Sequence, residues 1–336
     1  MHMQSKNGKR RVLTKLLGGL CLALGVAPAI GLAAGTADYP SRPINVIVAY
    51  APGGGSDLVV RLLVPFVEKE LGGNAHMIVV NHPGAGGAIG FAELARATPD
   101  GYTIGLINTP NVLTIPIERK TTFHWTSYDL LGNIVDDPDN FSVSADSPIK
   151  NLRDLAAFAK SKPNEVSVGT TGVGSDDHLA MLLFQKAAHV KMTHVPFKGA
   201  SEVRTSLQGG QITVGAINIG EALQFAKGGA NLRNLGVMAQ SRTAMASDVP
   251  TFKEQGYDIN LSSLRGLAAP KGLPPEIRQR LVAAIEKSIA NPAFQAKATA
   301  AFAPLRYLAP PKYAAELGEA EAQFGQLWKE LPWAEK

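Results

Sequence analysis

Two glycine-rich turns, each placed where a strand-like run passes into a helical pattern, constrain the fold of this chain more than any other feature. The first turn, residues 49–57, follows the apolar run Ile44–Val48, and the second, residues 81–90, follows Met77–Val80. A strand, a glycine turn and a helix together aim unpaired backbone N–H groups and the positive helix end at one point. Two such junctions predict a site for a small, negatively charged molecule.

Strand-like apolar runs alternate with helical patterns along the rest of the chain, and this alternation predicts an α/β fold with mainly parallel sheets. The pattern breaks at Asp136–Asp139 and again at Ser247–Pro250, and a second α/β unit lies between the breaks. We therefore expect one split lobe, residues 38–138 and 259–336, and one inserted lobe, residues 139–258. Ligands in open α/β sheets bind at the carboxyl ends of strands, so the cleft between the lobes is the expected site.

The N-terminal segment predicts export. A stretch with five basic residues and no acidic one comes first, an apolar stretch follows, and small residues continue up to Ala37. This order is typical of a secretory signal peptide. Cleavage after Ala33 and after Ala37 fits the small-residue rule about equally, and the pair Arg10-Arg11 leaves the twin-arginine route open beside the general one. We expect residues 1–37 to be removed.

The charge of the chain changes once this segment is removed. The full sequence has 33 Lys and Arg against 28 Asp and Glu, and five of the basic residues but none of the acidic ones precede Ala34. The mature chain is therefore neutral, with 28 residues of each sign, so its charge gives no indication of a nucleic-acid or membrane-surface partner. The single cysteine, Cys21, also lies in the signal, and we expect a mature protein without thiol or disulfide.

A series of short motifs runs along nearly the whole mature chain. In order, they are Tyr39–Ile44, Pro52–Asp57, Asn81–Gly90, Pro99–Thr103, Gly172–Ser175 with His178-Leu179, His194–Gly199, Asp248–Thr251 and Gly266–Pro270. In this order they resemble the Bug-type proteins, the periplasmic substrate-binding components of tripartite tricarboxylate transporters. A single glycine loop is weak evidence, whereas a whole series of motifs in the family's order is highly specific.

The resemblance implies a two-lobed periplasmic binding protein, a type II-like clamshell, that closes on a small and usually carboxylated ligand. Loops of the first lobe would hold a carboxylate through backbone N–H groups and ordered water, and the second lobe would recognise the rest of the ligand. The ligand-binding residues that it implies are Tyr50, Pro52, Gly53, Gly54, Gly55, Ser56, Asp57, Pro83, Gly84, Ala85, Gly86 and Gly87 on the first wall, and Thr170, Thr171, Gly174, Ser175 and His178 on the second.

The chain departs from the family's pattern at two places. The family often has an aromatic residue where this chain has Leu264, followed by Arg265, and it commonly has an acidic residue near Asn218. Both departures bear on the polarity of the ligand, so Asn218 and Arg265 join the predicted ligand-binding residues. An arginine inside an apolar strand needs a partner. That partner is either an internal acid such as Asp137 or a ligand carboxylate gripped by the planar guanidinium.

Several candidate residues have a second interpretation. Asp57 stands at a helix start, where an acid more often caps the helix than touches a ligand. Tyr50 either offers its hydroxyl to the ligand or packs between the lobes. Ser175 and His178 lie three positions apart, but no Gly-x-Ser-x-Gly turn surrounds Ser175, and we expect no catalytic residue. The histidines show no metal-ligand spacing, so neither a metal nor a cofactor is predicted.

A nucleotide-dependent enzyme is the main rival interpretation. The run Gly84-x-Gly86-x-x-x-Gly90 suggests it, but the usual third glycine falls at Ile89. We therefore predict a monomeric periplasmic receptor, without enzymatic activity, that binds a small carboxylate and delivers it to membrane transporter subunits. A ligand-sensing protein for a signalling partner is the alternative. The ligand stays open among dicarboxylates, tricarboxylates, aromatic acids, acidic amino acids and neutral vitamin-like molecules.

Overall fold

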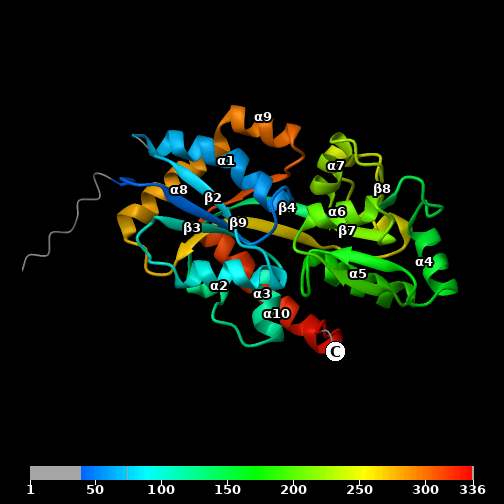
Figure 1. The fold of residues 1–336 in the computed structure, drawn as a ribbon. Helices are drawn as coiled ribbons and strands as arrows, with labels where there is room; N and C mark the ends of the chain where they lie inside the picture. Colours follow the sequence, from blue (N-terminus) through cyan, green and yellow to red (C-terminus); the bar gives the residue numbers. More distant parts are fainter. Residues whose placement is uncertain (1–38, 74, 335–336) are drawn as a thin grey trace, which may run out of the picture. The chain divides into compact units, whose positions relative to one another are not determined.

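Two long strands, β4 (Tyr128–Ser144) and β9 (Ser262–Pro270), form the centre of the sheet in this computed structural model, which describes residues 39–73 and 75–334 (Figure 1). The described residues belong to one of the two units into which the chain divides, residues 36–336. β4 and β9 pair antiparallel with each other along the N-terminal part of β4. The C-terminal part of β4 pairs with other strands, so β4 connects two groups of elements.

The first group of described elements contains three parallel strands, one further short strand and six α-helices. Its strands are β1 (Ile44–Val48), β2 (Met77–Asn81), β3 (Thr103–Asn108) and the short β10 (Leu305–Leu308). Its helices are α1 (Gly55–Leu71), α2 (Ala88–Arg96), α3 (Asn111–Glu118), α8 (Pro275–Ala290), α9 (Pro292–Ala300) and α10 (Pro310–Glu330). β1 lies between β2 and β3 and is parallel to both, whereas β3 meets β9, and β10 meets β4, in antiparallel fashion.

The second group repeats this plan around the other end of β4. Its strands are β5 (Ser167–Thr170), β6 (Thr193–Pro196), β7 (Val214–Asn218) and β8 (Leu232–Val237). Its helices are α4 (Leu152–Ser161), α5 (Asp176–Ala188), α6 (Ala200–Gln208) and α7 (Ile219–Lys227). β5 is parallel to β6 and β7, while β7 and β8 pair antiparallel with β4. The strand order through the sheet is β2-β1-β3-β9-β4-β7-β5-β6.

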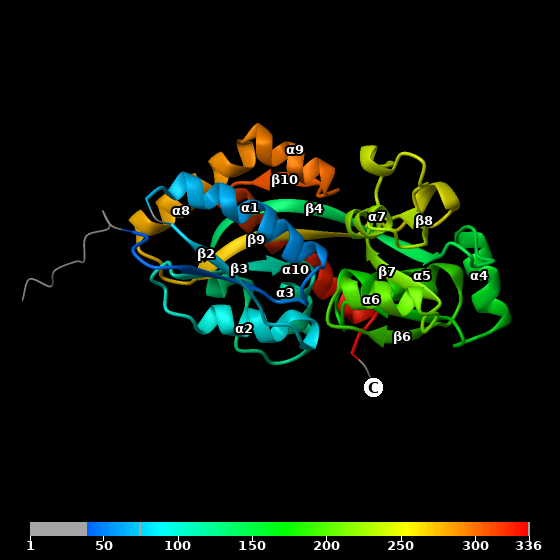
Figure 2. The same cartoon turned by 45° about the horizontal axis from the view of Figure 1, so that its top comes forward.

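Alternating side chains of β1 feed two apolar layers, one on each face of the first group of strands. Ile44, Val46 and Val48 pack with residues of α1, α8 and α9, whereas Ile47 packs with residues of α2, α3 and α10. Figure 2 shows α1, α8 and α9 on one side of these strands and α2 and α3 on the other. Because both faces are covered, β1 is apolar at nearly every position instead of at every second one.

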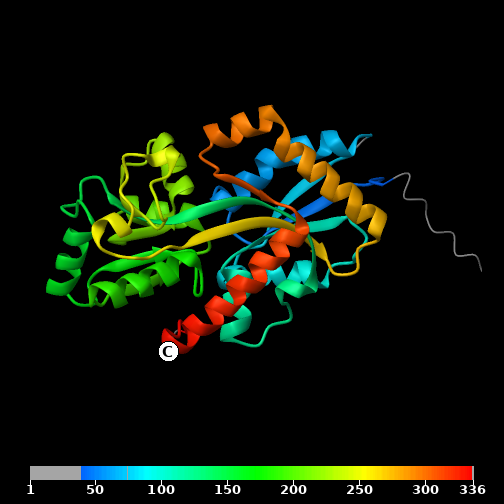
Figure 3. The ribbon, with the colours of Figure 1, turned by 180° about the vertical axis from the view of Figure 1, so that it is seen from behind.

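The C-terminal helix α10 reaches from the first group to the second (Figure 3). Its first half packs Tyr313 and Leu317 into the layer under β3. Beyond its end, Trp333 is 1% exposed and belongs to the core of the second group together with Phe141 and Phe184. The C-terminal segment therefore connects the cores of the two groups independently of β4 and β9.

The fold class is confirmed as α/β, but the structure differs from the sequence-based prediction in particular elements. Asp136–Asp139 does not break the pattern, because β4 continues through it with partners on either side. The outer strands of each group are parallel as expected, whereas pairing around β4 and β9 is antiparallel. Helices α3 and α7 and strand β10 were not predicted. The division at residues 138 and 258 stays a prediction.

Two further points concern the membrane and the N-terminus. The predicted signal peptide, residues 1–37, lies outside the described residues. Among the helices that the structure does describe, none is both long and apolar enough to cross a membrane.

Replacing Trp333 by alanine should lower the free energy of unfolding by about 3–5 kcal/mol, because it removes a large, fully buried ring from the core of the second group. Urea denaturation of both proteins measures the difference. Ile89→Ala is the control, since that side chain is 52% exposed and its loss should change the free energy of unfolding by about 0.5 kcal/mol or less. Similar values for the two variants would contradict a structural role of the C-terminal segment.

Candidate ligand-binding site

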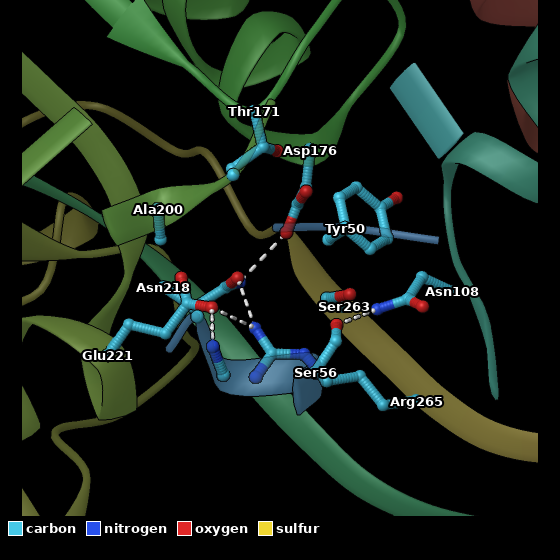
Figure 4. Close-up of a pocket in the computed structure, with 13 residues that line it drawn as sticks. Tyr50, Ser56, Asn108, Thr171, Asp176, Ala200, Asn218, Glu221, Ser263 and Arg265 are labelled. Atoms are coloured by element: carbon cyan, nitrogen blue, oxygen red, sulfur yellow. Dashed lines mark hydrogen bonds and ion pairs between the residues drawn. The ribbon is translucent and has the colours of Figure 1, made fainter. Parts of the chain in front are cut away.

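A pocket lies where the carboxyl ends of strands from both groups meet the first turns of helices (Figure 4). Its lining residues come from six places in the chain. They are Tyr50 and Gly54–Ser56 after β1, Asn108 at the end of β3, Thr171 and Asp176 after β5, Gly199 and Ala200 after β6, Asn218 and Glu221 around the start of α7, and Ser263 and Arg265 on β9. The space left between these side chains is about 20 Å³, enough for one water molecule. A ligand therefore needs the walls to separate or the side chains to move.

Arg265 is the only cationic side chain in the lining of this pocket, and it is 3% exposed. Its Nη2 donates a hydrogen bond of 2.6 Å to Oδ1 of Asn218. Its guanidinium also forms ion pairs with Asp137 (3.5 Å) and Glu221 (3.3 Å). Burial by itself would lower the pKa of Arg265, but the carboxylates of Glu221 and Asp137 outweigh it and raise this pKa. Asp137, the internal acid that the sequence suggested as the arginine's partner, is therefore paired with Arg265, and Glu221 is a second acidic partner.

Glu221 occupies the anion position that the first glycine turn creates. The N–H of Gly55, in the first turn of α1, donates to Oε1 of Glu221 at 2.7 Å, and the same oxygen faces Arg265. Glu221 lies in the first turn of α7, which starts directly after β7, and is 7% exposed. A Cβ atom on Gly55 would collide with Nη1 of Arg265 and Oε1 of Glu221. Glycine is thus required here for the close approach of a carboxylate.

Buried carboxyl groups outnumber the arginine in this region. Asp176 and Asp177 lie in the first turn of α5, and Asp139 lies on β4. One carboxylate oxygen from each of these three aspartates lies within 4.8 Å of the other two. Within the described part of the chain, they are the one group of three such side chains that lie close enough together to hold a metal ion. Burial raises the pKa of Asp176 to about 6 and lifts the pKa values of Asp139 and Asp177 well above the usual range.

The same acids are only partly hydrogen-bonded. Asp176 accepts from Nδ2 of Asn218 at 2.8 Å, and Asp177 accepts from the N–H and the hydroxyl of Thr171. Asp139 accepts from the N–H of the next residue. In the described structure, Oδ2 of Asp139 and Oδ1 of Asp177 have no partner. Burial also raises the pKa of Asp137, to about 7. The second wall is therefore rich in acceptors and short of donors.

Ser175 and His178 stabilise the loop that carries this wall. Ser175 caps α5, with its Oγ accepting from the backbone N–H of His178 at 3.1 Å. The imidazole Nδ1 of His178 accepts from the N–H of Gly174 at 3.2 Å, and the ring stacks on His194 at 3.9 Å. Burial, followed by the nearby His194, lowers the pKa of His178 to about 3, so this ring is neutral. The serine hydroxyl meets the backbone of His178 and not its imidazole, as a helix cap does.

Asp57 holds the first glycine turn in shape and does not line the pocket. Its carboxylate accepts from the N–H of Gly53 at 2.9 Å and also binds Arg61 and Asn81. Burial acts to raise the pKa of Asp57, but these hydrogen bonds outweigh it and lower this pKa. The capping interpretation is supported in a modified form, because the N-cap position itself is Gly54 and Asp57 bonds back from the first turn.

The second glycine turn contacts the opposite wall instead of the pocket. The carbonyl of Gly86 accepts from Nδ2 of Asn111 at 2.8 Å and lies within 3.5 Å of the Tyr50 hydroxyl. A Cβ on Gly172 would strike the backbone of Gly86, so these two glycines come into close contact. Tyr50 lines the pocket with its ring while also packing edge-on against Phe91. Both interpretations of Tyr50 are therefore compatible with its position.

The structure thus brings together only part of the predicted set. Seven predicted residues line the pocket, namely Tyr50, Gly54, Gly55, Ser56, Thr171, Asn218 and Arg265. The others do not line it, namely Pro52, Gly53, Asp57, Pro83, Gly84, Ala85, Gly86, Gly87, Thr170, Gly174, Ser175 and His178. Sequence reasoning missed Asn108, Asp176, Gly199, Ala200, Glu221 and Ser263. The signal that could have found two of them was their position, since Asn108 is the last residue of β3 and Glu221 follows the end of β7, as the glycine turns follow strand ends. Ligand contact by any of these residues stays a prediction.

Comparison with known proteins places this architecture. The family model described as "Tripartite tricarboxylate transporter family receptor" matches residues 59–305. The chain belongs to this family. It is 34% identical over 275 residues to the "UPF0065 protein in gbd 5'region" of Cupriavidus necator, an alignment that covers 80% of this chain and 82% of that protein.

Solved structures of the same kind agree with this assignment. The periplasmic binding protein BugD is 28% identical, with a TM-score of 0.83, and the match covers 89% of this chain and all of that one. MatC from Rhodopseudomonas palustris, solved with bound malate, is 25% identical, with a TM-score of 0.80, and the match covers 86% of this chain and 99% of that one. The fold of this receptor is therefore that of the Bug-type periplasmic binding proteins.

Asp176 should make the stability of this receptor fall as the pH rises between about 4 and 7, against an opposite contribution from His178, whose pKa burial lowers to about 3. The pKa of Asp176 is raised from 3.8 to about 6 in the folded protein, so the folded state keeps a proton that the unfolded chain has already lost. The contribution of Asp176 to the free energy of unfolding is fully present below the pKa of this carboxyl in the unfolded chain. It is lost as the pH rises through the pKa of the same carboxyl in the folded protein. In Asp176→Asn this fall should be smaller.

Urea denaturation at a series of pH values measures the effect on the free energy of unfolding. Glu254→Gln is the control, because that carboxylate is on the surface, away from the pocket, and its replacement should leave the fall between pH 4 and 7 largely intact. An equally steep fall in Asp176→Asn and in the unaltered protein would contradict the assignment.

Proposed function

We propose that this chain is a periplasmic solute receptor that binds a small carboxylate-containing ligand in the pocket between the β1–α1 and β5–α5 turns. One observation carries the proposal: the N–H of Gly55 and the guanidinium of Arg265 together hold a carboxylate, that of Glu221. A helix N-terminus and an arginine are both suited to carboxylates. The related MatC was solved with bound malate, a small carboxylate.

Ligand binding is proposed to close two lobes that β4 and β9 connect. The bending segments would be Val135–Asn140 of β4 and residues 260–267 around β9, where the chain passes between the two groups of elements. Closure brings α1 of the first group against α7 of the second, and contacts made only in the closed state stabilise it. The ligand then shifts the equilibrium by the free energy of these contacts.

The proposed place of action is the periplasm, after removal of residues 1–37, and the proposed partner is a tripartite tricarboxylate transporter in the membrane. Membership of the receptor family and the likeness to periplasmic binding proteins support both. The receptor would bind and release its ligand unchanged. A signalling partner in place of the transporter is the second candidate, which co-purification with membrane proteins distinguishes.

A thermal-shift panel on the exported, processed protein should identify the ligand class. The panel contains dicarboxylates such as malate and adipate, tricarboxylates, aromatic acids, amino acids and nucleotides. A ligand at about a hundredfold excess over its Kd stabilises the folded state by about 2.7 kcal/mol, which gives a clear rise in Tm. A rise with one class of carboxylate is expected. A rise in Tm with nucleotides alone would contradict the proposal. The absence of a rise with any of the carboxylates would contradict it as well.

Two neighbouring glycines offer a matched test of the carboxylate position. Gly55→Ala should weaken binding of the carboxylate found in the panel by about tenfold or more, because its Cβ takes the space of the carboxylate and of Arg265. Gly54→Ala is the control, since its Cβ meets no atom closer than 3.7 Å and its φ of −83° suits any residue. Isothermal titration calorimetry gives both Kd values. Equal effects of the two substitutions would place the carboxylate elsewhere.

A further inference from the structure

Glu221 already sits where the proposed ligand carboxylate would bind. We infer that Glu221 is a built-in competitor whose carboxylate occupies the site formed by the Gly55 N–H and Arg265 until the ligand carboxylate displaces it. This inference rests on the proposed function, and it adds that the receptor's affinity and selectivity are set by exchange between an internal and an external carboxylate.

The carboxylate of Glu221 has hydrogen-bond and ion-pair partners at only one of its two oxygens. One oxygen, Oε1, takes both the Gly55 N–H at 2.7 Å and the guanidinium at 3.3 Å. The other, Oε2, is buried and has no hydrogen-bond partner in the described structure, and neither has Nε of Arg265. A buried polar atom without a partner is costly. A ligand carboxylate that engages more of these donors with both oxygens is therefore favoured over Glu221.

Arg265 does not depend on Glu221 for its neutralisation. Asp137 forms a second ion pair with its Nη1, and Asn218 accepts from its Nη2 at 2.6 Å. Asp137 is itself fixed, because its Oδ1 accepts from the N–H of Gly220 at 3.0 Å. The buried arginine thus keeps partners when Glu221 leaves, which distinguishes a displaceable acid from a structural one.

The displaced side chain has a place to go. Glu221 and Arg265 also line a second cavity, whose other walls include Leu58 and Val59 of α1 and Gln224 of α7. Gln224 stands one turn after Glu221 on the same helix, within reach for a hydrogen bond between the two side chains. The carboxylate therefore separates two cavities, and a rotation of its side chain opens one at the expense of the other.

Acetate tests the inference without knowledge of the natural ligand, because it matches the end of the glutamate side chain. In Glu221→Ala, the Gly55 N–H and Arg265 lose their internal carboxylate, so sodium acetate should raise the Tm in a saturable manner, beyond the effect of sodium chloride at the same ionic strength. The unaltered receptor should respond to the two salts alike. The experiment uses the exported, processed protein.

Glu254→Ala is the matched control. Glu254 also accepts a backbone N–H, from Thr251 at 2.6 Å, and pairs with an arginine, Arg242, but it lies on the surface. Its removal should create no acetate-specific response. A folded Glu221→Ala without a response beyond that of chloride, or an equal response in Glu254→Ala, would overturn the inference.

Glu221→Gln provides the second measurement, since it keeps the shape of the side chain while removing its charge. Its Kd for the carboxylate found in the panel should fall by about tenfold, because a neutral amide competes more weakly for Arg265. An unchanged or higher Kd would overturn the inference and make Glu221 a ligand contact or a structural group.

The two proposals fail separately. If the unaltered receptor binds a carboxylate but Glu221→Ala shows no acetate response, only the exchange is wrong. If Glu221→Ala takes up acetate while no carboxylate binds the unaltered receptor, the internal site stands and the proposed function is wrong.

Discussion

The buried positive charge of Arg265 is the constraint to which the rest of the pocket is fitted. A guanidinium at 3% exposure on the central strand β9 is tolerated only with partners, because the loss of hydration is not otherwise offset. The partners come from β4, from the end of β7 and from α7, and the acid on α7 also accepts the N–H of Gly55 in α1. One charge thereby orders the ends of elements from both groups.

Around this arginine the protein places more carboxyl groups than a single cation can neutralise. Asp139, Asp176 and Asp177 lie close together, and their burial raises all three pKa values. The pocket is therefore not an open anion hole of the kind that two glycine turns suggest on their own. An external carboxylate enters such an environment most readily by replacing an internal one, and removal of Glu221 leaves Arg265 paired with Asp137 and Asn218.

Local patterns predicted the fold well wherever the signal was local. The apolar run Ile44–Val48 forms strand β1, and Gly54–Ser56 of the strand–turn–helix junction that follows it line the pocket. The predicted break at Asp136–Asp139 is wrong, because a polar run is typical of a turn when it is judged from the sequence alone. In the structure, Asp137 and Asp139 are buried in strand β4. Helix α7 was missed, and Glu221 with it. The Pro83–Gly87 turn was predicted to bind ligand, yet its Gly86 packs against Gly172.

By itself, the sequence determined the α/β class, the order of most elements, the family and the presence of an anion-binding turn at the start of α1. It could do so because periodicity, helix and strand breakers and short motifs are properties of neighbouring residues. Only the tertiary structure decided which N–H group faces the pocket and which acid it meets. Gly55 and Glu221 are 166 positions apart, and Arg265 meets Asn108 only through the pairing of β3 with β9. Such contacts depend on how strands pair and pack, which no local pattern in the chain encodes.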